Sequence, residues 1–241
     1  MKINMPTIKI NGIEYSKNKS TAIRFIDEKE EYILEPEVEL IETDCFKFNQ
    51  KIKKVIIPSN TNPLVIENNT FLSSNLREIE LPSNTSYIGE SAFANCLFLK
   101  DVTLNSKLDR INQFTFDNCA SLEKIVLPEG IKVINKFAFK NCTSLKEIVI
   151  PSSVVCIKKC AFKGCVNLKE ITLPKGIRTI EEAFDDTIEN IYIDKETLKN
   201  QPTFKSIYGE KIKITDLSLD ELLDAGKSLR EISNIYKNEE R

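Results

Sequence analysis

Hydrophobic residues recur along this chain in a fixed order, and the clearest marker is a repeated phenylalanine. The seven phenylalanines are Phe46, Phe71, Phe93, Phe116, Phe139, Phe162 and Phe184, spaced by 25, 22, 23, 23, 23 and 22 residues. An isoleucine precedes most of them by five residues, and a leucine follows the best copies by six. An apolar pair with a single residue between its members then closes each unit. Alternation with period 2 indicates a short β-strand with one buried face.

These alternating pairs predict one strand in each repeat. The predicted strands are Val55–Ile57, Ile79–Leu81, Val102–Leu104, Ile125–Leu127, Ile148–Ile150, Ile171–Leu173 and, in the last repeat, Ile191–Ile193. A proline follows most of them and ends the strand, because proline cannot donate to a β-ladder. One strand and its return path fit within about 20–29 residues, so stacked repeats pair their strands into a parallel sheet. The period therefore predicts a solenoid of short coils.

The repeated unit reads Ile-x-x-x-Ala-Phe-x-x-Cys-x-x-Leu-x-x-Ile-x-Leu-Pro and is clearest from Ile134 to Pro151. It resembles the BspA-like class of leucine-rich repeats, the class of bacterial surface antigens, over residues 33 to 193. The terminal repeats depart from the pattern, as capping coils do; Asp194, for example, replaces the proline. The resemblance implies a curved solenoid that binds protein or another ligand on a concave sheet and has no enzymatic activity. Many proteins of this class are surface-exposed and linked to adhesion.

We therefore predict an α/β protein, a right-handed leucine-rich-repeat solenoid with a parallel β-sheet and about seven 23-residue coils. The expected divisions are an N-terminal cap over residues 1–40, the solenoid over 41–193, a capping segment over 194–215 and a helical hairpin over 216–241. In the N-terminal cap, apolar alternation on both sides of Asn11-Gly12 predicts a β-hairpin. Such a hairpin would cover the open end of the core.

The last 26 residues predict two short helices. Ser218 with Glu221, and Ser228 with Glu231, form two capping boxes, and Gly226 between them suits a helix C-terminus. The apolar positions that could dock a partner here are Leu219, Leu222, Ile232 and Tyr236. The sequence of this segment also resembles the first half of a resolvase-type helix-turn-helix, which makes a DNA-associated adaptor an alternative function. No recognition helix follows, so a packing or protein-docking role is favoured.

Composition excludes several kinds of chemistry. The chain has no histidine, which removes Ser-His-Asp and Cys-His nucleophile arrangements and histidine-based zinc sites. Basic and acidic residues nearly balance, 34 against 36, so nucleic acid is an unlikely partner. Four of the seven cysteines, Cys96, Cys119, Cys142 and Cys165, recur with the repeat and are interpreted as reduced core residues. We expect no enzyme activity, no cofactor and no metal.

No signal peptide or membrane span is recognised in the sequence. A cytoplasmic location is therefore expected, with surface exposure or secretion by an unrecognised route as the alternative.

The candidate binding site is the residue between each buried strand pair, which alternation turns outward onto the concave sheet. These residues are Ile56, Glu80, Thr103, Val126, Val149, Thr172 and Tyr192. An apolar patch for a partner and the plain preference of β-branched residues for strands explain this composition equally well. The favoured function is protein–protein interaction through this face. A surface adhesin, or a regulatory adaptor using the C-terminal helices, is the alternative.

Overall fold

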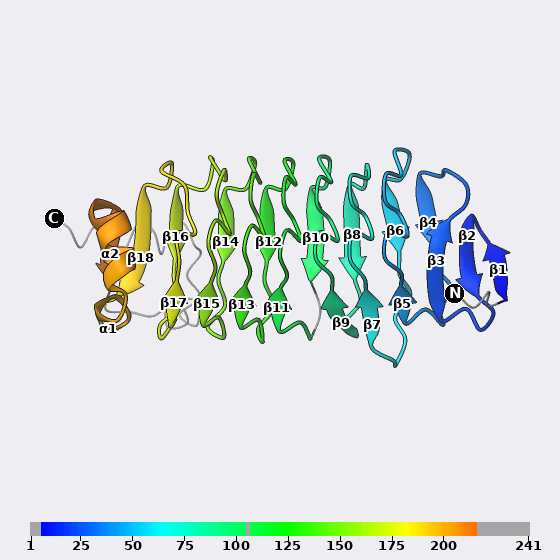
Figure 1. Cartoon of the computed structure of the whole chain (residues 1–241), viewed down its shortest axis with the longest axis horizontal. Helices are drawn as coiled ribbons and strands as arrows, with labels where there is room; N and C mark the ends of the chain where they lie inside the picture. Colours follow the sequence, from blue (N-terminus) through cyan, green and yellow to red (C-terminus); the bar gives the residue numbers. More distant parts are fainter. Residues whose placement is uncertain (1–5, 105–106, 216–241) are drawn as a thin grey trace, which may run out of the picture.

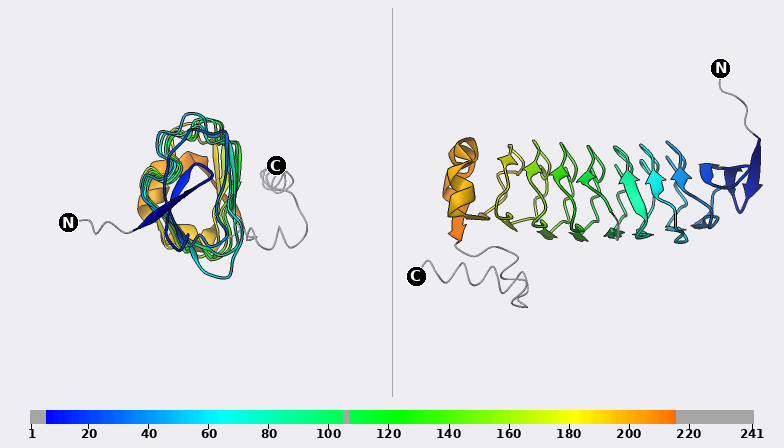
Figure 2. Two further views of the ribbon diagram at one scale, coloured as in Figure 1. Left: turned by 90° about the vertical axis from the view of Figure 1, so that its right-hand side faces the viewer. Right: turned by 90° about the horizontal axis from the view of Figure 1, so that it is seen from below.

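The computed structural model of the chain describes residues 6–104 and 107–215. The chain winds into coils that stack along one axis, with a β-hairpin at one end and short helices at the other (Figure 1). Viewed along that axis the coils superimpose (Figure 2). The predicted solenoid is confirmed. Its axis bends little in these views, so the sheet face expected to be concave is a nearly flat wall.

The predicted strands form a parallel sheet, called here the long sheet. Its strands are β4 (Glu31–Ile33), β6 (Lys54–Ile56), β8 (Glu78–Leu81), β10 (Asp101–Leu104), β12 (Lys124–Val126), β14 (Glu147–Val149), β16 (Glu170–Thr172), β18 (Asn190–Asp194) and β19 (Ile212–Thr215). Hydrogen bonds connect the six strands from β4 through β14 into one ladder, and they connect β16, β18 and β19 into a second. Strand β14 packs beside β16, so the two ladders adjoin. Equivalent residues of successive coils lie in register, as Ile125 does with Ile148.

A second set of parallel strands, which the sequence did not predict, lies on the other side of the coils. These short strands are β5 (Leu40–Ile41), β7 (Leu64–Ile66), β9 (Thr85–Ile88), β11 (Arg110–Ile111), β13 (Val133–Ile134), β15 (Cys156–Ile157) and β17 (Thr179–Ile180). Each ends on the isoleucine that precedes a repeated phenylalanine. Most contain only two to four residues, which is too short for alternation to be recognised in the sequence.

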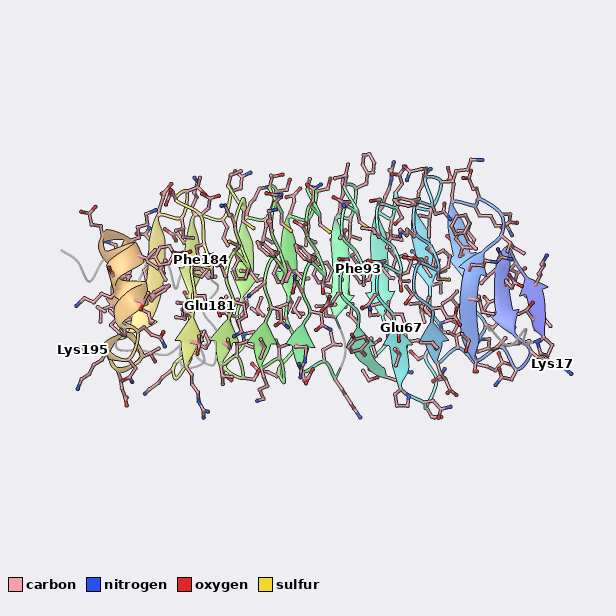
Figure 3. All side chains as sticks on the ribbon, in the orientation of Figure 1. Lys17, Glu67, Phe93, Glu181, Phe184 and Lys195 are labelled. Carbon is pink, nitrogen blue, oxygen red and sulfur yellow. The ribbon has the colours of Figure 1, made fainter. Side chains whose placement is uncertain are left out.

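The seven repeated phenylalanines fill the space between the two sheets, as expected. All are buried. Consecutive rings stack almost parallel at 5.2–5.6 Å between centroids, and Figure 3 shows Phe93 and Phe184 inside the coils. The backbone N–H of each phenylalanine up to Phe162 donates to a carbonyl of the next coil, as Phe139 does to Ala161 at 2.8 Å. Side-chain stacking and backbone bonding therefore repeat together.

The turns around each phenylalanine carry a second regularity. The residues two before and two after it have positive φ in six successive coils, as Asn69 (φ 56) and Ser73 (φ 56) do around Phe71. In most of these residues the backbone N–H then donates to the next coil, for example from Asn95 to Asp117 at 2.8 Å. Asparagine and aspartate tolerate this left-handed conformation better than most residues, which explains several of the asparagines in the repeat.

Both ends of the phenylalanine stack are closed. At the N-terminus, β1 (Thr7–Ile10) and β2 (Ile13–Ser16) form the predicted hairpin, with β3 (Thr21–Phe25) beside it. Phe25 stacks on Phe46 at 6.4 Å. At the C-terminus, α1 (Lys195–Lys199), α2 (Pro202–Tyr208) and the 3-10 turn η1 (Gly209–Lys211) cover Phe184. The predicted helical hairpin over 216–241, with Leu219, Leu222, Ile232 and Tyr236, lies outside the described residues.

The cysteine ladder is buried, as the sequence predicted. Cys96, Cys119, Cys142 and Cys165 are free thiols inside the coils, and each Sγ lies 3.0–3.2 Å from the carbonyl of the phenylalanine in the preceding coil. Burial raises the pKa of Cys96 to about 12 and raises the pKa values of Cys119 and Cys142 as well. These thiols remain protonated near neutral pH.

Thiol titration tests this arrangement. In native protein at pH 8, we expect fast labelling of Cys156 and Cys160 only, because these two are partly exposed and the other five cysteines are buried. The thiolate is the reacting species, so the raised pKa values of Cys45, Cys96, Cys119 and Cys142 slow these four buried thiols further. Labelling with a chromogenic disulfide, with and without urea, measures both classes. Fast reaction of all seven thiols in native protein would contradict the packing of the core.

Candidate binding face

The outer face of the long sheet presents two neighbouring columns of side chains. The first, called the outward column, contains the seven residues predicted from the sequence. The second, called the charged column, lies two residues earlier on each strand. Its members are Glu31, Lys54, Glu78, Asp101, Lys124, Glu147, Glu170 and Asn190. Alternation along the strands turns both columns away from the core, and the buried residue between them, such as Ile125, packs inside.

The structure confirms that most of the outward column is accessible. Val126 is 56% exposed and Ile56 is 37% exposed. Glu80 and Thr103 are exposed, and Val149 and Thr172 are partly exposed. Strand pairing brings them side by side: Thr103 lies opposite Val126, and Val126 opposite Val149. The column is therefore continuous from β6 to β16, with its valines at the centre.

The expectation that Tyr192 is accessible is wrong, because its side chain is only 2% exposed. Its strand β18 lies between β16 and β19, with Thr172 and Lys213 in register on either side. Alternation fixes the direction in which a side chain leaves the strand but not how far its neighbours cover it. A large ring beside the helical end of the solenoid is covered, whereas the short side chain of Val126 in mid-sheet is not.

One member of the outward column was missed. Ile33 on β4 lies in register with Ile56 and is 51% exposed. Tyr32 and Leu34 on either side of it are buried, but this strand precedes the first repeated phenylalanine, which marks the repeats in the sequence. The apolar surface therefore begins one strand earlier than predicted.

The charged column carries more acidic than basic groups. Glu78 sits between Lys54, with which it forms an ion pair at 2.6 Å, and Asp101 in the next strand. The nearby carboxylate of Glu78 raises the pKa of Lys54. Asp101 and Glu78 are register partners on adjacent strands, and two carboxylates in such positions repel each other.

Shallow hollows follow one another along this face. One of about 420 Å³ lies over β6, β8 and β10 and is lined by Ile56, Glu80, Asp101 and Thr103, among others. A second, also about 420 Å³, extends over β10 and β12 beside Val126. A third of about 310 Å³ lies between β14 and β18. Their linings mix carboxylates with aliphatic groups, which suits side chains of a protein partner better than one small ligand.

The rest of the described chain offers little chemistry. Within residues 6–104 and 107–215, no group of three or more cysteine, aspartate or glutamate side chains is placed to hold a metal ion. No described helix is long and apolar enough to cross a membrane. The outward side of the short strands, which the sequence did not reveal, includes Tyr87, Arg110 and Cys156. Most of these strands turn a single residue outward, although β9 exposes both Ser86 and Tyr87, so this side presents a narrower surface than the long sheet.

These features define a leucine-rich-repeat solenoid, a class whose members are typically binding scaffolds without enzymatic activity. More specifically, residues 64–191 match the BspA type leucine rich repeat region in six copies. The chain belongs to this family, as the repeated unit had indicated.

Solved structures of bacterial proteins share the fold. A leucine-rich repeat protein from Eubacterium ventriosum aligns with a TM-score of 0.67 and 24% identity over 77% of this chain and 49% of its own. One from Bacteroides ovatus aligns with a TM-score of 0.56 and 20% identity, over 80% of this chain and 57% of its own. This chain thus spans about half the length of those proteins. No match was found among curated proteins.

Proposed function

We propose that this protein binds a partner protein through the outer face of the long sheet. The observation that supports the proposal is the continuous, accessible outward column from Ile33 to Val149, in which Ile33 lies beside Ile56 and Val126 lies beside Val149. Neighbouring exposed apolar residues, as in these two pairs, can mark interaction sites. Membership of a family of binding solenoids supports the same assignment.

The charged column adds the chemistry of the partner. Carboxylates outnumber ammonium groups along it, and Glu78 and Asp101 lie on adjacent strands between those of Ile56 and Val126. A partner surface with apolar side chains flanked by lysine or arginine would complement this face. Association would then be faster at low ionic strength, because the charges at the rim are screened by salt.

Two glutamate substitutions in the outward column test the proposal. Val126→Glu with Val149→Glu should leave the fold intact, because both side chains point away from the core. Partner binding should be lost, since two more carboxylates would be desolvated in an apolar contact beside existing acidic groups. Affinity capture from the source organism, with quantitative mass spectrometry, compares the variant with the unchanged chain, and circular dichroism confirms folding.

Two controls make the result specific. Leu97→Glu with Phe98→Glu adds the same charge at two other exposed apolar residues, outside the long sheet, and should keep the captured partner. A chain truncated after Thr215 tests the alternative that the predicted C-terminal helices bind the partner. Capture that survives the Val126 and Val149 substitutions and is lost with the truncation would refute the assignment to the sheet.

A further inference from the structure

Two partly exposed phenylalanines stand outside the core on the turns that follow β11 and β13. Phe114 and Phe137 stack at 4.9 Å between centroids and 6° between planes. They follow β11 and β13 in the same way as Glu67 and Glu181, which are labelled in Figure 3, follow β7 and β17. They belong neither to the buried phenylalanine stack nor to the long sheet.

The backbone conformation makes these two rings unusual at their position in the repeat. Both occupy the position two residues before a repeated phenylalanine, with φ of 58° and 61°. At the same position the first three coils have Asp44, Asn69 and Ser91. Small polar residues of that kind accommodate the left-handed conformation, whereas bulky aromatic residues there are strained. Stacking of the two rings offsets part of this backbone strain, but both stacked residues are strained.

The neighbouring coils leave the pair accessible at both ends. The equivalent positions on either side are Ser91 and Cys160, which are small. The two rings therefore form a raised apolar block instead of one section of a continuous aromatic column. A side chain of a partner could pack on either outer ring face.

Two lysines lie on the turn that carries Phe137, and a third, Lys163, lies on the equivalent turn of the next coil, near Glu182. The ammonium group of Lys140 lies 5.5 Å from the centre of the Phe137 ring. Lys136 precedes that ring, and Lys163 occupies the position of Lys140 in the next coil, where its carbonyl accepts from Asn141. Among the described residues none of these three lysines has an ion-pair partner, whereas Lys159 is paired with Glu182 at 2.8 Å. In the preceding coil, the position equivalent to that of Lys140 is occupied by an acidic residue, Asp117, which lies near Lys140.

We propose that Phe114, Phe137, Lys136, Lys140 and Lys163 form a second binding surface, which takes an acidic protein segment bearing an aromatic or aliphatic side chain. The apolar side chain packs on the two rings while carboxylates of the segment pair with the lysines. This surface has the opposite charge to the long sheet, so the two faces select different partners.

Fluorescent peptides provide the test with the full chain. The probe is a 12-residue peptide of alternating Asp/Glu and Phe/Leu, beside one with its apolar residues changed to Ser and one with its carboxylates changed to amides. We expect the first peptide to bind and both altered peptides to bind at least about tenfold more weakly, as loss of interface anchors produces. Raising salt from 50 to 500 mM should weaken the binding further.

Matched variants locate the binding. Phe114→Asn with Phe137→Asn, and separately Lys136→Gln with Lys140→Gln and Lys163→Gln, should each weaken the peptide about tenfold or more. The phenylalanine variant should keep or raise its urea midpoint, because asparagine fits the left-handed backbone. Lys100→Gln with Lys124→Gln and Lys175→Gln removes equal charge elsewhere and should bind normally. Val126→Glu with Val149→Glu should also bind normally, which separates this surface from the proposed function.

Several results would overturn the proposal. One is the absence of binding by the acidic apolar peptide, and another is tighter binding of an oligothymidylate or of polygalacturonate, which would assign the surface to a nucleic acid or a polysaccharide. A third is a phenylalanine variant that loses stability yet keeps peptide affinity, which would make the ring pair purely structural.

Discussion

Replacing Phe139 by alanine is expected to lower the free energy of unfolding by about 3–5 kcal/mol, the usual cost of removing a buried phenylalanine ring. Phe139 is fully buried inside the stack. Its ring lies 5.3 Å from that of Phe116 and 5.4 Å from that of Phe162. The cavity would therefore open between two coils, both of which lose contacts. Urea denaturation followed by circular dichroism measures the change.

Phe98→Ala serves as the control, because it removes the same ring from a surface site that is 46% exposed. Its urea midpoint should stay close to that of the unchanged chain. Equal losses from the two substitutions would show that the stack contributes no more than an exposed ring. A separate early transition in the Phe139 variant would indicate that coils on the two sides of the cavity unfold independently.

Tyr208→Phe is expected to cost about 1–3 kcal/mol, the penalty of leaving a buried polar group without a partner. In the other coils the N–H of the repeated phenylalanine donates to the following coil. After Phe184 no further coil of this kind follows in the described chain, and the Tyr208 hydroxyl replaces it. The hydroxyl oxygen accepts from the N–H of Phe184 at 3.1 Å and donates to its carbonyl at 3.2 Å.

The matched control is Tyr87→Phe, which removes a hydroxyl from a ring that is exposed on a short strand. Thermal unfolding should show little change for Tyr87→Phe and a lower midpoint for Tyr208→Phe. Amide hydrogen exchange provides a direct readout, since the Phe184 amide should lose protection in the second variant. Unchanged exchange at Phe184 would mean that Tyr208 is not the cap of this ladder.

The repeat made the core of this protein predictable from its sequence. A phenylalanine that returns with nearly constant spacing must face the same surroundings in each coil, so one buried column followed directly. The parallel strands followed from apolar alternation before each proline. The buried cysteines followed because a small apolar residue recurs at a fixed distance from the phenylalanine.

Other features depended on interactions that no single repeat contains. The short strands around Ile134 and Ile157 pair only with equivalent segments one coil away, and each is too short to show a pattern by itself. Helix α1 is capped by Asp194, and helix α2 begins at Pro202. A single capping residue and a single proline are weak signals outside the repeat. The burial of Tyr192 depends on its neighbouring strands and not on its own position in the alternation.

The turns with positive φ also depend on interactions between coils that the sequence of one repeat does not reveal. Asparagine at position 69, 95, 118 or 141 is compatible with a left-handed residue, but Phe114 and Phe137 at such turns contradict local preference. At Phe114 the backbone conformation is held by bonding to the next coil, from its N–H to the Lys136 carbonyl at 3.3 Å. A conformation imposed by the stack is invisible to propensity.

The hydrogen bonds between successive coils join equivalent backbone atoms in each coil. One coil could therefore be added or removed without changing the pattern of bonding. Phe93 donates to Thr115, Phe116 to Ala138 and Phe139 to Ala161. Excising residues 116–138 would place Thr115 directly before Phe139, with the same acceptor facing the same donor. Gene duplication or deletion in whole units can therefore lengthen or shorten such a molecule without redesigning its ends. Its recognition area would then grow or shrink in discrete steps of one strand.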